Sequence, residues 1–212
     1  MNGNASALGQ AHTTERSASS AARGYSLLEI VFVLGLTMTI TGIAIPQTVA
    51  TVEEVRAAGA ARYISARLQR ARMEAIARST DVGLQFVPTD GKYRYGTYLD
   101  GNANGIRTRD IETGIDRQVV APERLSDQFR SIDFGVLPAL PAIDSSSAPP
   151  GSDPVKLGSS NIVTFTPEGT SSPGSLYILG PHNIQYAIRV FGETGKTRVL
   201  KFDLHTRRWK PL

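Results

Sequence analysis

The sequence predicts an α+β protein in which a long N-terminal helix, membrane-spanning and then amphipathic, packs on an antiparallel β-sheet domain. Three observations predict it. No charged residue occurs between Ile30 and Val52. Apolar residues then recur with a helical period to about residue 78, and beyond Asp81 they alternate with a period of two. The strand candidates follow one another without intervening helices, so the sheet is expected to be antiparallel.

The composition excludes several classes of function. The chain has 212 residues, no cysteine and only three histidines. Disulfide scaffolds, zinc–thiolate sites, iron–sulfur clusters and cysteine nucleophiles are therefore excluded. The sequence holds no Walker A, Rossmann glycine or Gly-x-Ser-x-Gly motif, and no histidine has a motif partner. We therefore expect no enzymatic activity and no cofactor, with calcium as the exception considered below.

The N-terminal segment divides into a polar leader and an apolar run. Residues 1–24 are rich in Ala, Ser, Gly and Thr and show no hydrophobic period, so they are expected to be unstructured. The run Ile30–Val52 has 23 uncharged residues, enough to cross about 30 Å of hydrocarbon as a helix. A buried core helix is the alternative, which this length and all-round apolarity disfavour. A secretory signal peptide fits less well, because the polar-to-apolar border precedes the run, at Gly24-Tyr25.

The helix is predicted to continue as an amphipathic segment over residues 48–80. Its apolar residues at positions 64, 68, 71 and 75 are spaced i, i+4, i+7 and i+11, which places them on one helix face. Arginines occupy much of the remaining surface. We interpret them as a solvated face, with phosphate binding as the alternative. They are Arg56, Arg62, Arg67, Arg70, Arg72 and Arg78.

Residues 81–212 are predicted to form the β domain. Alternation around Pro88–Gly91 predicts a hairpin, and Gly192–Gly195 is expected to be the turn of another. A segment rich in Pro and Ser near 137–160 is expected to be a long loop. The remaining strand candidates are Arg117–Val120, Phe129–Phe134, Ile162–Phe165, Leu176–Leu179, Gln185–Phe191 and Thr197–Phe202.

The segment Arg23-Gly-Tyr-Ser-Leu-Leu-Glu29, followed by the apolar run, resembles the class III signal of type IV pilins and type II secretion pseudopilins. The resemblance implies that residues 1–24 are a leader removed by a prepilin peptidase between Gly24 and Tyr25, with N-methylation of Tyr25. It implies that residues 25–47 form a transmembrane and assembly helix in which Glu29 guides assembly. Pro46 matches a helix kink of that family. By itself, Glu29 is also compatible with a position in the headgroup layer, favoured by the helix dipole.

The passage Arg62–Ile76 before Val82-x-Leu84, together with Thr164–Gly169 and Gly195–Arg198, resembles the GspH/FimT branch of these proteins. The resemblance implies a minor pseudopilin of a type II secretion system, a subunit of a periplasmic pseudopilus involved in protein secretion. A FimT-like minor type IV pilin, acting in pilus assembly or DNA uptake, is the alternative. A single-pass anchored periplasmic domain without a filament role is a third. The implied partners are other pilins or pseudopilins, through the N-terminal helix, the prepilin peptidase and an inner-membrane assembly platform.

A loop over residues 100–112 is the candidate calcium site. Its oxygen-bearing residues alternate and a glycine stands sixth, as in an EF-hand loop. The twelfth position is Ile111, where a bidentate Glu is expected, and a plain turn would use the same residue types. A structural turn and calcium binding therefore both stay open. The candidate ligands are Asp100, Asn102, Asn104 and Asp110.

The C-terminus carries a basic cluster that could bind DNA. Seven Lys and Arg residues stand against two acids in the last 24 residues, with Trp209 among them as a possible stacking group. In the FimT branch a Gly-Arg-x-Arg-like hairpin is associated with DNA uptake, and Gly195–Arg198 is a lysine variant of it. A solvated hairpin and tail is the alternative. The candidate contacts are Lys196, Arg198, Arg207 and Arg208.

Overall fold

The computed structural model describes residues 24–145 and 147–212, with the side chains of residues 43–50 excepted. Residues 1–23 of the expected leader and the side chain of Pro46 lie outside the described residues. The chain divides into two compact units, Met1–Ala44 and Ile45–Leu212, which are treated separately below.

One helix, α1 (Leu27–Arg78), runs through both segments that the sequence predicts as helical. In the first unit, residues 24–42 are all exposed. The hydroxyl groups of Thr37, Thr39 and Thr41 donate to the carbonyls four residues earlier, at 2.6–2.9 Å. These polar groups are therefore satisfied inside the helix. Among the described residues, a search for a helix apolar and long enough to traverse a bilayer finds none.

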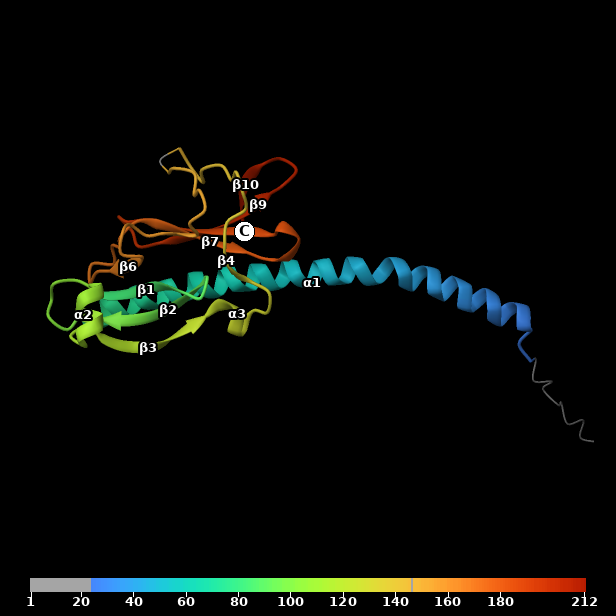
Figure 1. The fold of residues 1–212 in the computed structure, drawn as a ribbon, viewed down its shortest axis with the longest axis horizontal. Helices are drawn as coiled ribbons and strands as arrows, with labels where there is room; N and C mark the ends of the chain where they lie inside the picture. Colours follow the sequence, from blue (N-terminus) through green and yellow to red (C-terminus); the bar gives the residue numbers. More distant parts are fainter. Residues whose placement is uncertain (1–23, 146) are drawn as a thin grey trace, which may run out of the picture. The chain divides into compact units, whose positions relative to one another are not determined.

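In the second unit, one face of α1 forms the centre of the hydrophobic core. Ile64, Leu68, Ala71 and Ala75 are buried, which confirms the predicted face. The neighbouring buried residues are alanines, whose small side chains allow the helix to approach the sheets closely. The core cluster includes residues from both sheets, so α1 packs against both of them (Figure 1).

The first sheet has four strands in the order β3-β2-β1-β6. Strands β1 (Val82–Thr89) and β2 (Lys92–Leu99) form the predicted hairpin. Its turn residues Asp90 and Gly91 have φ of 53° and 74°, the left-handed conformations that a two-residue hairpin needs. Strands β3 (Arg117–Arg124) and β6 (Ile162–Phe165) complete the sheet.

The second sheet is also antiparallel, with the order β10-β9-β8-β7-β4 and β5 paired to β7. Its central strands lie where the alternation predicts them. The long loop near 137–160 covers the outer face of this sheet, where Leu140 and Ile143 pack with Tyr177 and Trp209. The strands are β4 (Asp133–Phe134), β5 (Val155–Lys156), β7 (Gly174–Leu179), β8 (Gln185–Val190), β9 (Thr197–Asp203) and β10 (Arg208–Pro211).

The structure differs from the sequence-based prediction in several short elements, among them β5, which lies inside the predicted long loop. The strand predicted over 129–134 is a turn after helix α3 (Leu125–Gln128), and only β4 is extended. Here Asp127 accepts the Arg124 backbone N–H at 3.3 Å, which stabilises the start of α3. Helix α2 (Thr108–Thr113), the short helix η1 (Pro181–Asn183) and strand β10 were not predicted, because each is too short for a clear period.

Candidate functional site

The proposed processing segment is accessible. Gly24 is exposed, with open space where a side chain would stand, and Tyr25 is 79% exposed. Helix α1 begins at Leu27, so the Gly24-Tyr25 bond lies just ahead of the helix, in chain without regular secondary structure. Glu29 lies in the first turn of α1, where the helix dipole favours a negative charge.

The N-terminal part of α1 exposes apolar side chains on all sides. Large apolar residues from Leu27 to Ile40 are 49–82% exposed. A surface this apolar is costly in water, which indicates burial against lipid or other proteins. Glu29 is the one charged residue in the described part of this segment.

The loop after β2 is organised by backbone N–H groups that point at Asp100. Its Oδ1 accepts from the amides of Asn102 and Ala103 at 3.0 and 2.9 Å, and its Oδ2 accepts from Gly105 at 2.7 Å. Asp100 is buried, and these three bonds satisfy much of its charge. Of the other candidate calcium ligands, Asn102 and Asn104 are exposed.

A second carboxylate, which sequence reasoning missed, closes the same loop. Asp116 is only 2% exposed and accepts the amides of Gly101 and Arg107 at 3.3 and 3.0 Å. A contact of 3.5 Å joins the Asn102 amide nitrogen to Asp110 Oδ2. No group of three or more His, Asp or Glu side chains placed to hold a metal ion occurs among the described residues. The internal bonds account for the shape of this loop, and calcium binding stays a prediction.

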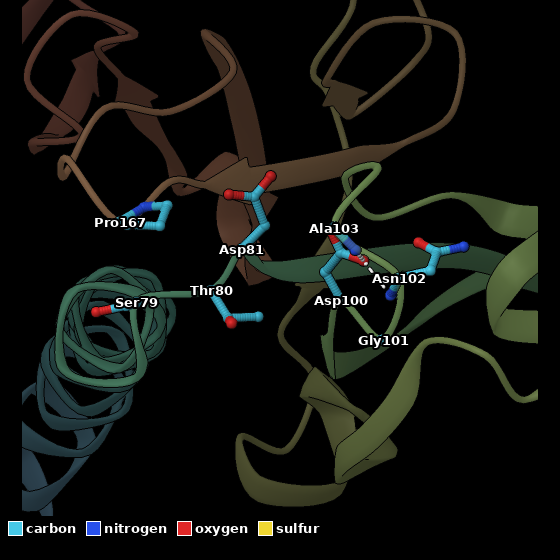
Figure 2. Close-up of a pocket in the computed structure, with 8 residues that line it drawn as sticks. All are labelled: Ser79, Thr80, Asp81, Asp100, Gly101, Asn102, Ala103 and Pro167. Atoms are coloured by element: carbon cyan, nitrogen blue, oxygen red, sulfur yellow. Dashed lines mark hydrogen bonds between the residues drawn. The ribbon is translucent and has the colours of Figure 1, made fainter.

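The loop borders a hollow of about 530 Å³ at the C-terminal end of α1 (Figure 2). Asp81 lies at its wall beside Asp100, and Pro167 lies opposite. Partial burial raises the pKa of the Asp81 carboxyl, and the negative charges of Asp100 and Glu168 raise it further. The electrostatic potential in the hollow is therefore negative, and the ionised form of Asp81 is disfavoured there.

The four candidate DNA contacts are all exposed, but the structure divides them into two pairs. Lys196 and Arg198 lie where β9 begins, and the Arg198 guanidinium stacks 5.5 Å from the Phe191 ring centroid. Arg207 and Arg208 lie beyond the end of β9. A seven-residue strand spans about 20 Å, so the four residues do not form one continuous patch.

Trp209 is used for packing. Its ring lies 5.1 Å from that of Phe202 and 6.1 Å from that of Tyr177, and its indole N–H donates to the Pro141 carbonyl at 3.2 Å. The aromatic residue that the sequence suggested as a base-stacking group is therefore held inside the outer cluster of the second sheet.

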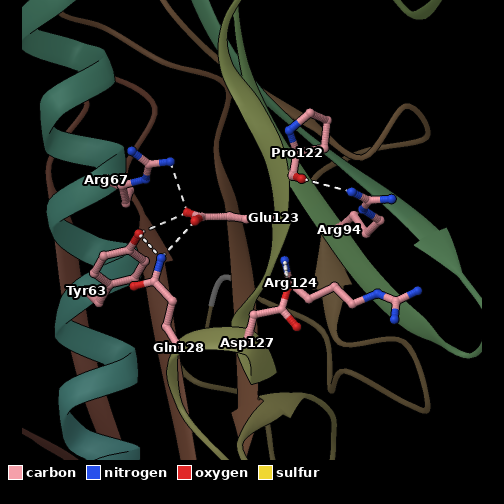
Figure 3. Close-up of polar contacts among 8 residues, drawn as sticks. All are labelled: Tyr63, Arg67, Arg94, Pro122, Glu123, Arg124, Asp127 and Gln128. Atoms are coloured by element: carbon pink, nitrogen blue, oxygen red, sulfur yellow. Dashed lines mark hydrogen bonds and ion pairs between the residues drawn. The ribbon is translucent and has the colours of Figure 1, made fainter.

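Part of the arginine-rich face of α1 is paired to β3 and α3 (Figure 3). The Glu123 carboxylate accepts from Tyr63 Oη at 2.9 Å, from Arg67 Nη2 at 3.0 Å and from Gln128 Nε2 at 2.7 Å. Arg67 is thus not part of a solvated face. No local signal reveals this network, because its members lie far apart in the sequence.

Comparison with known families decides the relationship of this chain. The family model described as Type II transport protein GspH matches residues 60–194, which is well over half of the chain. The chain belongs to the GspH family. The resemblance expected from the sequence is thereby confirmed, and the chain is a type IV pilin-like protein of the GspH type.

Two relatives are similar to this GspH-family chain. The pilin-like protein PilA1 of Thermus thermophilus is 40% identical over 82 residues, which cover 39% of this chain and 51% of that protein. The chain thus matches about half the length of this curated relative. The minor pseudopilin EpsH from the Type 2 Secretion System of Vibrio cholerae aligns with 69% of this chain and 97% of its own, at 14% identity and a TM-score of 0.43.

Proposed function

We propose that this GspH-family protein is a structural subunit of a pilin-like filament, in the first instance a minor pseudopilin of a type II secretion system. The observation that carries the proposal is the exposed apolar helix from Leu27 to Ile40. Neighbouring filament subunits would bury it by helix-to-helix packing, and the function would be structural and not enzymatic.

Before assembly, the same helix would hold the subunit in the inner membrane, with the β domain in the periplasm. The uncharged run Ile30–Val52 supports this proposal by its length. The internal bonds of Thr37, Thr39 and Thr41 support it further, because they satisfy these three hydroxyl donors within the helix. A prepilin peptidase would remove the leader, and an inner-membrane assembly platform would extract the subunit.

Glu29 would then favour the subunit in the assembled filament over the free subunit in the membrane. A carboxylate at the edge of the hydrocarbon is costly unless it finds a partner. Cleavage after Gly24 creates an amine on Tyr25, four residues before Glu29. In a filament the amine of one subunit would neutralise Glu29 of its neighbour.

The experiment replaces Glu29 with Ala and with Asp, and measures membrane insertion, cleavage and recovery in sheared filaments. Glu29→Ala should insert and be cleaved normally but be depleted from filaments by about tenfold or more, because it cannot pair with the amine. Glu29→Asp keeps the charge and is the matched control. Normal incorporation of the alanine variant would reject Glu29 as the assembly partner.

A FimT-like minor type IV pilin is the second candidate. One observation favours it, namely that Lys196 and Arg198 are exposed two residues apart at the start of β9. Lys196 directly precedes β9 and Arg198 lies within it, so both cations could meet a phosphate backbone.

A further inference from the structure

We propose that the tip of the β9–β10 hairpin, residues Leu204–Arg208, docks on the anionic surface of the bilayer that holds the N-terminal helix. The proposal rests on the membrane-held state described under the proposed function. It assigns a role to a surface that filament assembly does not explain. The tip would set the orientation of the β domain before the subunit is extracted.

Contacts between β9 and α1 show how far the tip extends along the helix. At the start of the strand, Thr197 Oγ1 lies 2.6 Å from Ser65 Oγ. Towards its end, Lys201 forms an ion pair with Glu54. Four residues of β9 therefore cover the same distance as eleven residues of α1. At the usual rise per residue the strand segment is about 13 Å long and the helix segment about 16 Å. Strand β9 thus runs along α1 towards the N-terminus of the helix.

In the same direction, the tip extends beyond the level of Glu53 and Glu54, the charged residues of α1 that border the uncharged run. From Lys201 to Leu204 the chain advances by up to about 10 Å, equal to about six helix residues. Counted from Glu54, this reaches the level of the uncharged run, which ends at Val52. Along α1, Leu204 is therefore level with the C-terminal end of that run, which belongs to the same compact unit.

The tip has the chemistry of a membrane-surface contact. Leu204 is 50% exposed at the apex, and His205, Arg207 and Arg208 are exposed beside it. Three carboxylates lie near the tip: Asp203 pairs with Lys210, Glu54 pairs with Lys201, and Glu53 bonds the His182 imidazole. Arg207 and Arg208 are therefore the surplus charge, suited to lipid phosphates, and Leu204 is suited to the acyl-chain boundary.

The tip is also held in one conformation. Asp203 Oδ1 accepts the backbone N–H groups of His205 at 2.9 Å and Thr206 at 3.1 Å. Arg207 has φ of 51° and donates to the Ala139 carbonyl at 3.0 Å, which leaves its other N–H groups available. Binding to a surface would therefore cost the tip little conformational entropy.

A hollow of about 380 Å³ lies behind the tip, between it and α1. Its lining holds the ion pairs of Lys201 with Glu54 and of Lys210 with Asp203, together with His182 and His205. His182 itself bonds Glu53 at 2.6 Å, which ties this wall to the helix at the same level as the Glu54 pair. DNA would also satisfy the cations, but it offers no partner for the exposed leucine.

The test uses the full chain, which has no native cysteine. Leu204→Cys and the matched control Lys196→Cys, each labelled with a fluorophore, are reconstituted into vesicles of phosphatidylcholine with and without 30% phosphatidylglycerol and a headgroup-attached quencher. We expect quenching at position 204 to exceed that at 196 at least threefold in anionic vesicles. Arg207→Glu with Arg208→Glu, or about 0.5 M salt, should remove most of the difference.

Equal quenching at the two positions, or a difference that survives the charge reversal, would overturn the proposal. A label at 204 that responds to duplex DNA and not to lipid would also overturn it, as would a response to inorganic phosphate alone. Alkaline extraction of the same vesicles separates this result from a failure of the proposed function. If the chain stays inserted but the tip is not quenched, only the docking proposal fails, whereas a chain that washes off overturns the membrane-held state as well.

Discussion

Arg67 of α1 and Glu123 of β3 form an ion pair, with Nη2 and Oε1 3.0 Å apart, that joins the helix to the edge strand of the first sheet. The side chains are only 16% and 25% exposed, and Tyr63 and Gln128 bond the same carboxylate. This network fixes an edge strand by polar contacts to α1 and α3. It gives Arg67 a structural role in holding the helix to the sheet.

Glu123→Ala should destabilise the β domain by about 1–3 kcal/mol, because three donors lose one partly buried acceptor. For a protein of this size, this corresponds to a fall in Tm of about 3–10 °C, measurable by calorimetry. Lys156→Ala is the control, since its ion pair with Asp153 at 3.6 Å joins two side chains that are 44% and 43% exposed, and it should change stability by less than about 0.5 kcal/mol. Equal effects of the two substitutions would contradict the network.

Processing should occur at the border that the sequence marks. After coexpression with a prepilin peptidase, intact-mass measurement should show loss of residues 1–24 and the mass of one methyl group added to Tyr25. Gly24→Val should block cleavage, because the peptidase would no longer meet the small residue before the scissile bond. Uncleaved wild-type protein, or cleavage beyond Val52, would refute the class III signal.

Asp81→Asn should raise the Tm at neutral pH by about 1–2 °C. Burial and the charges of Asp100 and Glu168 raise the pKa of Asp81 above its ordinary value of 3.8, so the ionised form is less favourable in the folded state. The folded state therefore loses stability as pH rises from the unfolded pKa through the raised folded pKa. The advantage of the variant should vanish below about pH 3.8, where both states are protonated, and a gain that persists there would contradict the electrostatic cause.

Calcium should be tested through Asp110 and not through Asp100. Removing the Asp100 carboxylate breaks three bonds to backbone amides and would unfold the loop whether or not an ion binds. If the loop binds calcium, millimolar calcium should raise the Tm of the wild type by mass action, and Asp110→Asn should reduce that gain. An absence of any calcium-dependent shift in the wild type would leave the loop as a turn held by Asp100 and Asp116.

DNA binding, if present, should depend on the two basic pairs separately. Phosphate contacts release counterions, so binding should weaken steeply with salt. Under the FimT-like alternative, replacing Lys196 and Arg198 with Ala should lower the affinity for DNA. The slope of log affinity against log salt concentration should fall by the amount expected for about two phosphate contacts. The matched control replaces Arg207 and Arg208, about 20 Å away along β9, and should have a smaller effect. No binding by the wild type at low salt would remove the alternative.

Several parts of the fold follow from local patterns. The face of Ile64, Leu68, Ala71 and Ala75 is buried as its spacing predicts, and the turn at Asp90-Gly91 joins the two strands that alternate around it. The strand predicted over 129–134 forms only at Asp133–Phe134, because helix α3 ends at Gln128 and a turn at Ser131, with φ of 66°, follows. Strand β10 was missed because pairing to β9, and not its own sequence, makes it extended.

The sequence by itself determined the long helix, its uncharged run, the Gly24-Tyr25 border and the antiparallel strands, because each depends on the periodicity or order of residues that are neighbours along the chain. Only the tertiary structure decided which charges are paired and which surfaces they form. It paired Arg67 with Glu123, directed backbone amides at Asp100 and Asp116, packed Trp209 on Phe202, and separated Lys196 from Arg208. These outcomes depend on the register between α1, β3 and β9, which long-range packing fixes and no local pattern encodes.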